Sequence, residues 1–365
     1  MQLFVRNENF EITGMLDQYI SLEWVKRYYE TGDFVLKTVA NEETVQLLRK
    51  RQYITREDDE MLCQIETVNI VTDAENGNVI TASGRSVEKL LGQRIVWKQT
   101  NSTASMTAEQ FIRKLIDENA INPTNPKRKI PKLKLGEIKG FPEKIEKQIT
   151  GDNLLVAITE ICQTYQYGFE ITMDETGEMV FDLYKGEDRS YKQEKNPYVV
   201  FSDDFENIIN TEYSYDESNM TNVALIGGEG EGTARKYQEI GDSEGFERYE
   251  LFVDAKDVSS NSGEISGPEY NNMLLERGKE KLAENTFVET YDGELETENT
   301  YRYKQDYNIG DVVQIENRFG MSATSRIIEV IESDNENGHR FVPTYANWES
   351  GDEGQWQYYQ DIMTL

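Results

Sequence analysis

The residues that could do chemistry are few and far apart. His339 is the single histidine, directly after a predicted turn, and a Ser–His or Cys–His nucleophile pair would have to be built on it. No nucleophile-elbow motif accompanies it. The two cysteines, Cys63 and Cys162, form no CxxC pair and no zinc-ligand spacing. We therefore predict no catalytic residue, no cofactor and no metal site, and expect His339 to be an exposed turn residue.

The two cysteines leave two interpretations open. One long disulfide is possible, but two buried free thiols fit better, and free thiols suit assembly in a reducing cytoplasm.

Carboxylates are abundant, with 68 Asp and Glu against 38 Lys and Arg and a formal net charge of −30. Paired carboxylates can cleave glycosidic bonds, but their separation in space decides this, and no pair stands out. The acidic turns ending at Gly77 and Gly338 suggest calcium, yet counting back from them places Thr72 or Ser333 at the first ligand position of an EF-hand loop. The charge also argues against specific nucleic-acid binding, because phosphates need Lys and Arg, although DNA could pass without sticking.

A glycine-rich segment, 228–232, follows a predicted strand at 222–228 and invites a phosphate-binding interpretation. Its spacing is not that of a P-loop, and Glu229 and Glu231 would repel phosphate. We expect a flexible surface loop instead. The N-terminus lacks a signal-peptide pattern, and no apolar run reaches 18 residues, so no stable membrane insertion is expected.

The elements that must position these residues are clearest between Tyr307 and Tyr345. Gly310-Asp311 leads into a strand at 312–315, an apolar run follows at 327–331, and the hairpin turn 334–338 leads into a last strand. This pattern predicts three or four short antiparallel strands, most simply part of a small barrel.

The same order of landmarks recurs near the start of the chain. Gly32-Asp33 precedes a strand at 34–36, and strands at 65–71 and 79–82 flank the turn 73–77. The two turns, Asp-Ala-Glu-Asn-Gly and Asp-Asn-Glu-Asn-Gly, differ at one position of five. Acidic hairpin turns can resemble each other by chance, but two landmarks in the same order favour an internal repeat, with an insertion in the first copy and a register uncertain by one.

Local signals place further elements. Strands are predicted at 3–5, 11–13, 21–25, 34–39, 169–173, 179–183, 208–215 and 248–255. Helices are predicted after Ser86, after the capping box of Thr107 and Gln110, after Asp152 or Asn153, and from Pro268 to about Glu284.

Two segments keep two interpretations each. Residues 122–142 hold four of the seven prolines and the only basic island, made of Lys127, Arg128, Lys129, Lys132, Lys134 and Lys139. This island either docks on an acidic neighbour, such as another copy of the chain, or is a linker or edge segment kept soluble by its lysines. The acidic, aromatic tail after Tyr345 either docks on a partner or packs back on its own domain.

The expected fold is α+β and β-rich, with two small β-barrel-like modules flanking α+β middle domains. The expected units are a first β module (1–84), a helical segment with a Pro/Lys-rich linker (85–150), α+β middle domains (151–286), a second β module (287–346) and the C-terminal tail (347–365).

An ordered series of segments resembles the siphophage Gp37-like tail proteins, within the wider baseplate-hub family of long-tailed phages and related injection systems. These segments are Phe201-Ser202-Asp203-Asp204-Phe205-Glu206-Asn207, Asn222-Val223-Ala224-Leu225-Ile226-Gly227-Gly228, Glu247-Arg248-Tyr249-Glu250-Leu251-Phe252-Val253-Asp254-Ala255 and Tyr307-Asn308-Ile309-Gly310-Asp311-Val312-Val313. The resemblance covers nearly the whole chain and rests on no single diagnostic motif.

The resemblance implies a structural hub at the virion tail tip. Family hubs form homotrimers in which six barrels make a pseudo-hexameric ring that adapts sixfold to threefold symmetry, and its bore would pass DNA and the tape-measure protein. The implied partners are a distal tail ring protein or the tail tube, the tape-measure protein, and a spike, fibre or receptor-binding protein. We expect the β modules to contact the ring above and the middle domains to hold the trimer together.

Two alternatives remain open: a tail-associated cell-wall hydrolase and a receptor-binding tail module. Many family members append a hydrolase or a fibre after the hub, whereas this chain stops at Leu365, soon after its last predicted strand. We therefore expect a non-enzymatic protein.

Overall fold

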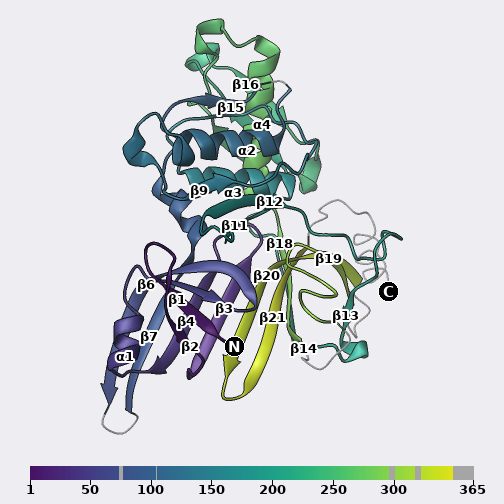
Figure 1. The fold of residues 1–365 in the computed structure, drawn as a ribbon. Coiled ribbons are helices and arrows are strands. Elements are labelled where there is room, and N and C mark those ends of the chain that lie inside the picture. The colour runs from purple at the N-terminus through teal and green to yellow at the C-terminus, as the bar shows by residue number, and fades with distance from the viewer. Residues whose placement is uncertain (74–76, 104, 296–300, 317–321, 348–365) are drawn as a thin grey trace.

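The computed structural model describes residues 1–73, 77–103, 105–295, 301–316 and 322–347 (Figure 1). The longer helices lie to one side of a large twisted sheet, whereas the short helix at 42–47 lies beside the N-terminal strands, and the sheet contains strands from both ends of the chain. The predicted aromatic tail lies outside the described residues from 348 onward.

Seven strands and one helix form the N-terminal part, and side chains along each strand alternate between two faces. The elements are β1 (Leu3–Arg6), β2 (Ile12–Leu16), β3 (Ser21–Arg27), β4 (Asp33–Val39), α1 (Glu42–Leu47), β5 (Tyr53–Arg56), β6 (Asp59–Asp73) and β7 (Gly77–Ser86). One face is buried and contributes Leu22, Trp24, Phe34, Leu36, Ile80 and Ala82 to the core. The other face exposes Glu23, Lys37 and Asn69 to solvent.

The next part packs two helices on a small group of strands. Its elements are η1 (Val87–Gln93), β8 (Thr100–Asn101), α2 (Ala108–Ile116), η2 (Asp117–Ile121), η3 (Pro126–Arg128), β9 (Leu133–Leu135), β10 (Gln148–Ile149), α3 (Leu154–Tyr165), β11 (Gly168–Met173) and β12 (Met179–Tyr184). The predicted capping box of Thr107 and Gln110 is confirmed. Asn153, not Asp152, caps α3, and the helix predicted after Ser86 is a 3-10 turn, η1.

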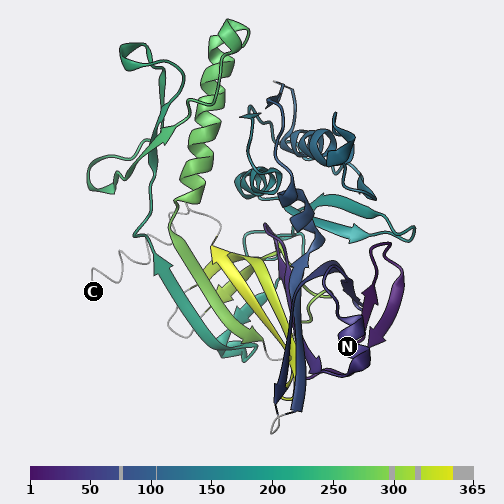
Figure 2. The same cartoon turned by 90° about the vertical axis from the view of Figure 1, so that its left-hand side faces the viewer.

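A further layer consists of α4 and three strands. The elements are β15 (Val223–Gly227), η5 (Gly232–Ala234), β16 (Tyr237–Ile240), η6 (Gly245–Glu247), β17 (Glu250–Asp254), η7 (Asn261–Gly263) and α4 (Gly267–Glu284). Ser266 caps α4, and Pro268 lies in its first turn as predicted. Tyr270, Met273 and Leu274 pack against the strands. Figure 2 shows α4 running down towards β18 at one side of the large sheet.

The remaining strands join the N-terminal ones in a single sheet. They are β13 (Val200–Ser202), preceding η4 (Asp203–Phe205), then β14 (Ile208–Asp216), β18 (Val288–Leu295), β19 (Val312–Glu316), β20 (Ser322–Asn335) and β21 (Gly338–Asn347). Sixteen of the described strands form this sheet. The two ends of the chain meet where β20 pairs antiparallel with β3, from Glu329 opposite Arg27 to Asn335 opposite Ser21.

The order of strands across the sheet repeats. In the N-terminal set the neighbours run β3-β4-β7-β6-β5-β1, and in the C-terminal set they run β14-β18-β21-β20-β19-β13. Both sets follow the same order along the chain, with α4 and its strands inserted between β14 and β18. One difference is that β1 pairs antiparallel with β5, whereas β13 pairs parallel with β19.

This order corrects one predicted equivalence. The two hairpins, β6–β7 and β20–β21, correspond as expected. Gly32-Asp33, however, leads into β4, whereas Gly310-Asp311 leads into β19, which occupies the place of β5. The match between these two landmarks is therefore wrong, because a Gly-Asp turn can precede a strand at any place in a sheet. The path of the described strands is open, so the two barrel-like modules stay a prediction.

Candidate functional site: the junction between the two strand sets

The junction of β3 and β20 is reinforced by a buried ion pair on its core face. Arg56 on β5 donates two hydrogen bonds to Glu332 on β20, at 2.6 and 2.7 Å, and the relative exposure of the two residues is 3% and 5%. The Arg56 guanidinium also lies over the ring of Trp24, 5.6 Å from its centroid. Since β5 and β20 belong to different strand sets, this pair ties the two sets together.

His339 belongs to the same cluster. Its Nε2 lies 2.7 Å from Glu332 Oε1, and its ring packs edge-on against Phe341. Burial opposes ionisation of Glu332, but the hydrogen bonds from His339 and Arg56 outweigh it, and the pKa of Glu332 lies below its ordinary value. His339 is exposed, as expected, but it lies at the start of β21 rather than in the turn, and its partner is the buried carboxylate of Glu332.

A second buried carboxylate, Asp59 at the start of β6, joins three segments. Lys26 on β3 lies 3.1 Å from it, and Lys304, in the segment before β19, lies 2.7 Å from it. Burial acts to raise the pKa of Asp59, but the two ammonium groups outweigh burial and hold the pKa well below its usual range. The carboxylate therefore stays ionised and links both strand sets.

The solvated face of the junction carries exposed and half-buried polar side chains. Arg27 bridges Asp33 and Glu329, each at 2.6 Å, and Arg85 on β7 pairs with Glu66 at 2.9 Å. The guanidinium groups of Arg27 and Arg85 are thus neutralised within the chain.

The Gly310-Asp311 landmark has a structural role that the sequence pattern did not reveal. The buried Asp311 carboxylate accepts hydrogen bonds from the backbone of Glu187 and Asn308 and from Arg189 Nε, at 2.7 to 2.9 Å. Gly310 has a φ of +90°, and a Cβ there would lie 2.3 Å from the ring of Tyr28. The pair anchors the loop after β12 to the C-terminal strands.

The other candidate residues have structural surroundings. Cys63 and Cys162 are buried free thiols, as expected, and burial raises the pKa of both. The glycine-rich segment is tethered rather than loose: Glu229 accepts hydrogen bonds from Ser260 N and Lys236 Nζ, and its backbone N–H donates to the Tyr270 hydroxyl.

The basic segment is largely used within the chain, as an edge segment. Its strand β9 pairs parallel with β12 at the end of the sheet path. Lys134 binds Asp174 and Glu178, and Arg128 lies over Trp97. The edge position agrees with the interpretation as an edge segment, and docking on an acidic neighbour stays a prediction.

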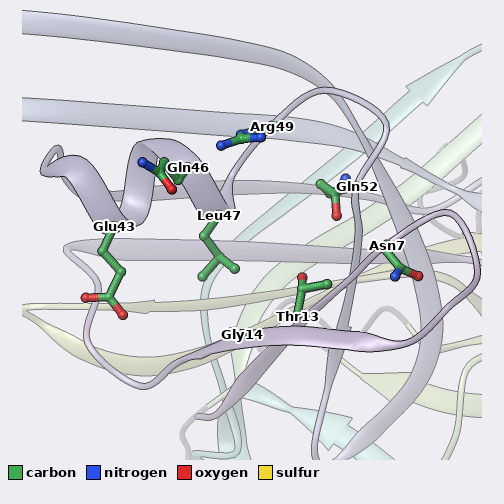
Figure 3. Close-up of a pocket in the computed structure, with 8 residues that line it drawn as sticks. All are labelled: Asn7, Thr13, Gly14, Glu43, Gln46, Leu47, Arg49 and Gln52. Carbon is green, nitrogen blue, oxygen red and sulfur yellow. The ribbon is translucent and has the colours of Figure 1, made fainter.

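A pocket of about 420 Å³ lies between α1 and β2, next to the β1–β2 turn (Figure 3). It is lined by Asn7, Thr13, Gly14, Glu43, Gln46, Leu47, Arg49 and Gln52. Glu43 is the one carboxylate in this lining, whereas glycoside cleavage by the usual mechanism needs two. Within the described ranges, no three His, Cys, Asp or Glu side chains cluster as a metal site would require, and no helix has the length and apolar character to cross a membrane.

The fold resembles that of three solved tail proteins over nearly the full length of each chain. The tail protein of Neisseria meningitidis MC58 has a TM-score of 0.57 at 14% identity, covering 94% of this chain and 96% of that one. The 43 kDa tail protein of prophage MuSo2 from Shewanella oneidensis has a TM-score of 0.58 at 13% identity, covering 95% and 98%. Prophage tail protein gp18 of Listeria monocytogenes EGD-e has a TM-score of 0.56 at 12% identity, covering both chains fully.

At sequence identities of 12–14%, the structural similarity shows a shared fold and no more. No curated protein sequence matched the chain. The family model described as Siphovirus ReqiPepy6 Gp37-like protein matches residues 2–345. The match spans both strand sets and everything between them, and the chain therefore belongs to this Gp37-like family.

Proposed function

We propose that the chain is a non-enzymatic hub protein at the tail tip of a long-tailed phage or a related injection particle. Three copies form a ring that closes the tail tube and adapts its sixfold symmetry to threefold symmetry. The observation that carries this proposal is the repeated strand order: one chain presents two equivalent strand sets side by side in one sheet. Three such chains supply the six similar units that a sixfold neighbour requires.

The family and the shared tail-protein fold support the placement in a virion tail. The partners we propose are the distal tail ring protein or tail tube on one side and a spike, fibre or receptor-binding protein on the other. The tape-measure protein and DNA pass through the bore without specific nucleic-acid binding.

The solvated face of the large sheet suits the wall of that bore. Its β3, β4 and β6 strands expose Glu23, Lys37 and Asn69, while the opposite face is core. Arg27 and Arg85 on this side are paired with carboxylates. Pairing of these two guanidinium groups with carboxylates weakens their attraction for a phosphate backbone, since phosphate affinity comes from Lys and Arg that displace counterions from the nucleic acid.

Mass photometry of the purified chain across a range of concentrations tests the ring. We expect a trimer that accumulates as concentration rises, and cryo-electron microscopy of it should show six similar strand sets around one axis. A chain that stays monomeric throughout, with no trimer in assembled particles, would refute the proposal.

Two assays separate the hub from the alternative functions. A zymogram containing cell wall should stay uncleared if the chain is a hub, whereas a hydrolase would clear it. Binding of the isolated protein to host cell-wall sugar would instead support the receptor-binding module.

A further inference from the structure

The contact between β3 and β20 joins equivalent strand sets within one chain, and it provides a template for a contact between chains. β20 is long. On one edge, its first half pairs with β19 and its second half, from Glu329 to Asn335, pairs with β3. On its other edge it pairs with β21.

β6 is the counterpart of β20 in the N-terminal set, and its second half lacks the corresponding neighbour. On one edge, β6 pairs with β7 from Cys63 to Asp73. On the other edge, β5 and the two residues before it cover β6 only as far as Ile65. Beyond that point, no strand in the described parts of the chain occupies the place that β3 takes beside β20.

β14 is the counterpart of β3, and it lacks the complementary neighbour. β3 pairs with β4 on one side and with β20 on the other. Among the strands that the structure describes, β14 pairs with β18 alone. In Figure 1 the β6–β7 hairpin and β14 lie at opposite sides of the large sheet.

We propose that the second half of β6, residues 66–73, pairs antiparallel with β14 of a second copy of this chain. The junction repeats the pairing of β20 with β3. This proposal rests on the ring proposed above. It assigns the contact between copies to the strand sets, whereas the sequence had suggested that the middle domains make that contact.

The repeat fixes the register of this junction. Ile70 takes the place of Glu332, because both pair with the corresponding residue of the next strand, Ile80 in one set and Phe341 in the other. Tyr213 takes the place of Trp24 through the matching ladders Trp24–Phe34–Gly84 and Tyr213–Tyr291–Tyr345. Since Glu332 lies opposite Trp24, Ile70 should lie opposite Tyr213 of the second copy, and Val71 opposite Glu212.

The composition of the β6 edge favours a partner strand. The segment Glu66 to Asp73 contains no lysine and no proline, the residues that usually protect a free edge. Ile70 and Val71 are 45% and 51% exposed, and a strand alongside would cover them.

A second copy of this chain fits this edge because its β14 is the counterpart of β3, the strand that occupies the same place beside β20.

A contact of this kind is compatible with a closed ring. Because the β6 edge of one copy meets the β14 edge of the next, the contact is head to tail and leaves one edge of each kind at the ends of any open chain. Three copies joined in this way contain three internal β20–β3 junctions and three β6–β14 junctions, which alternate around the ring.

Disulfide trapping tests the junction. The double variants I70C/Y213C and V71C/E212C place cysteines at two adjacent pairs, and one of these pairs must be of the closer, non-hydrogen-bonded type. The native cysteines are buried. V25C/I331C, which spans the internal junction, is the positive control and should form a bond within one chain. The single variants I70C and Y213C are the negative controls.

Mild oxidation should convert at least one double variant into linked dimers and trimers on a denaturing gel, reversed by reductant. A trimer in mass photometry without a linked species from either double variant would refute the β6–β14 pairing but not the trimeric ring. A chain that is monomeric at every concentration would overturn both. As a second test, I70K should shift trimer to monomer while the circular dichroism spectrum of the fold is kept, and an undiminished trimer would contradict the junction.

Discussion

Removal of the Glu332 carboxylate should strongly destabilise the fold, because it leaves the Arg56 guanidinium buried without its main partner. Arg56 lies in β5 and Glu332 in β20, at 2.6 Å, with side-chain exposures of 0% and 6%. We therefore expect E332L and R56M each to destabilise the protein and to weaken the connection between the two strand sets.

The magnitude follows from the burial of the pair. Removing one partner of a buried ion pair costs about 3–5 kcal/mol. Arg56 retains Asp58, whose side chain is 55% exposed and whose contact contributes little, so E332L should lie near the lower end, at about 3 kcal/mol. The double variant R56M/E332L removes both charges and should come within about 1 kcal/mol of the unmodified chain.

The assay is urea unfolding at one fixed chain concentration, since association shifts apparent stability. The pKa of Glu332 is below its ordinary value, so the pair stabilises the fold above the unfolded pKa of about 4.3, and this stabilisation is lost as pH falls through the lower folded pKa. The cost of E332L should therefore shrink towards acid pH. H339N, which alters the more exposed partner, is the matched control and should cost less than about 1 kcal/mol. Single variants that cost as little as this control, or a double variant whose cost equals the sum of the singles, would refute the reasoning.

Three further changes should be measurable in the same unfolding assay. G310A places a Cβ 2.3 Å from the Tyr28 ring at a φ of +90° and should lower the free energy of unfolding by at least about 2 kcal/mol. G140A is the control, because Gly140 has a φ of +80° and open space around the added Cβ, and it should cost about 1 kcal/mol. Equal costs for the two variants would show that the contact with the Tyr28 ring is unimportant. T107A removes the side chain that accepts the Gln110 N–H at the start of α2 and should cost about 1 kcal/mol, whereas T107S should be close to neutral. Burial raises the pKa of Glu88, so the folded state favours the protonated carboxyl, and the stability that Glu88 contributes is present at low pH and lost as pH rises through the folded pKa. E88Q should therefore stabilise the protein at pH 8 and have little effect at pH 4. An equal effect at both pH values would contradict the predicted pH dependence.

Local patterns predicted a large part of the fold. The β20–β21 hairpin, the capping box before α2 and Pro268 in the first turn of α4 all follow from signals within a few residues, because turns and caps satisfy backbone groups of their immediate neighbours. The sequence also predicted an internal repeat, and the buried free thiols agree with the expectation for Cys63 and Cys162.

The places of the strands within the sheet required the tertiary structure. The sequence matched β19 with β4, whereas pairing places β19 beside β20 as the counterpart of β5. It also did not show that β13 and β14, far upstream, belong beside the C-terminal strands.

By itself, the sequence determined where most of the longer helices, strands and turns begin, and that two hairpins of the chain are related. Only the tertiary structure decided that β3 meets β20 and that Arg56 meets Glu332, 276 residues away. The physical reason is that a strand edge offers the same backbone donors and acceptors to any partner. The choice of partner depends on which side chains become buried together, and that is settled only when distant segments pack.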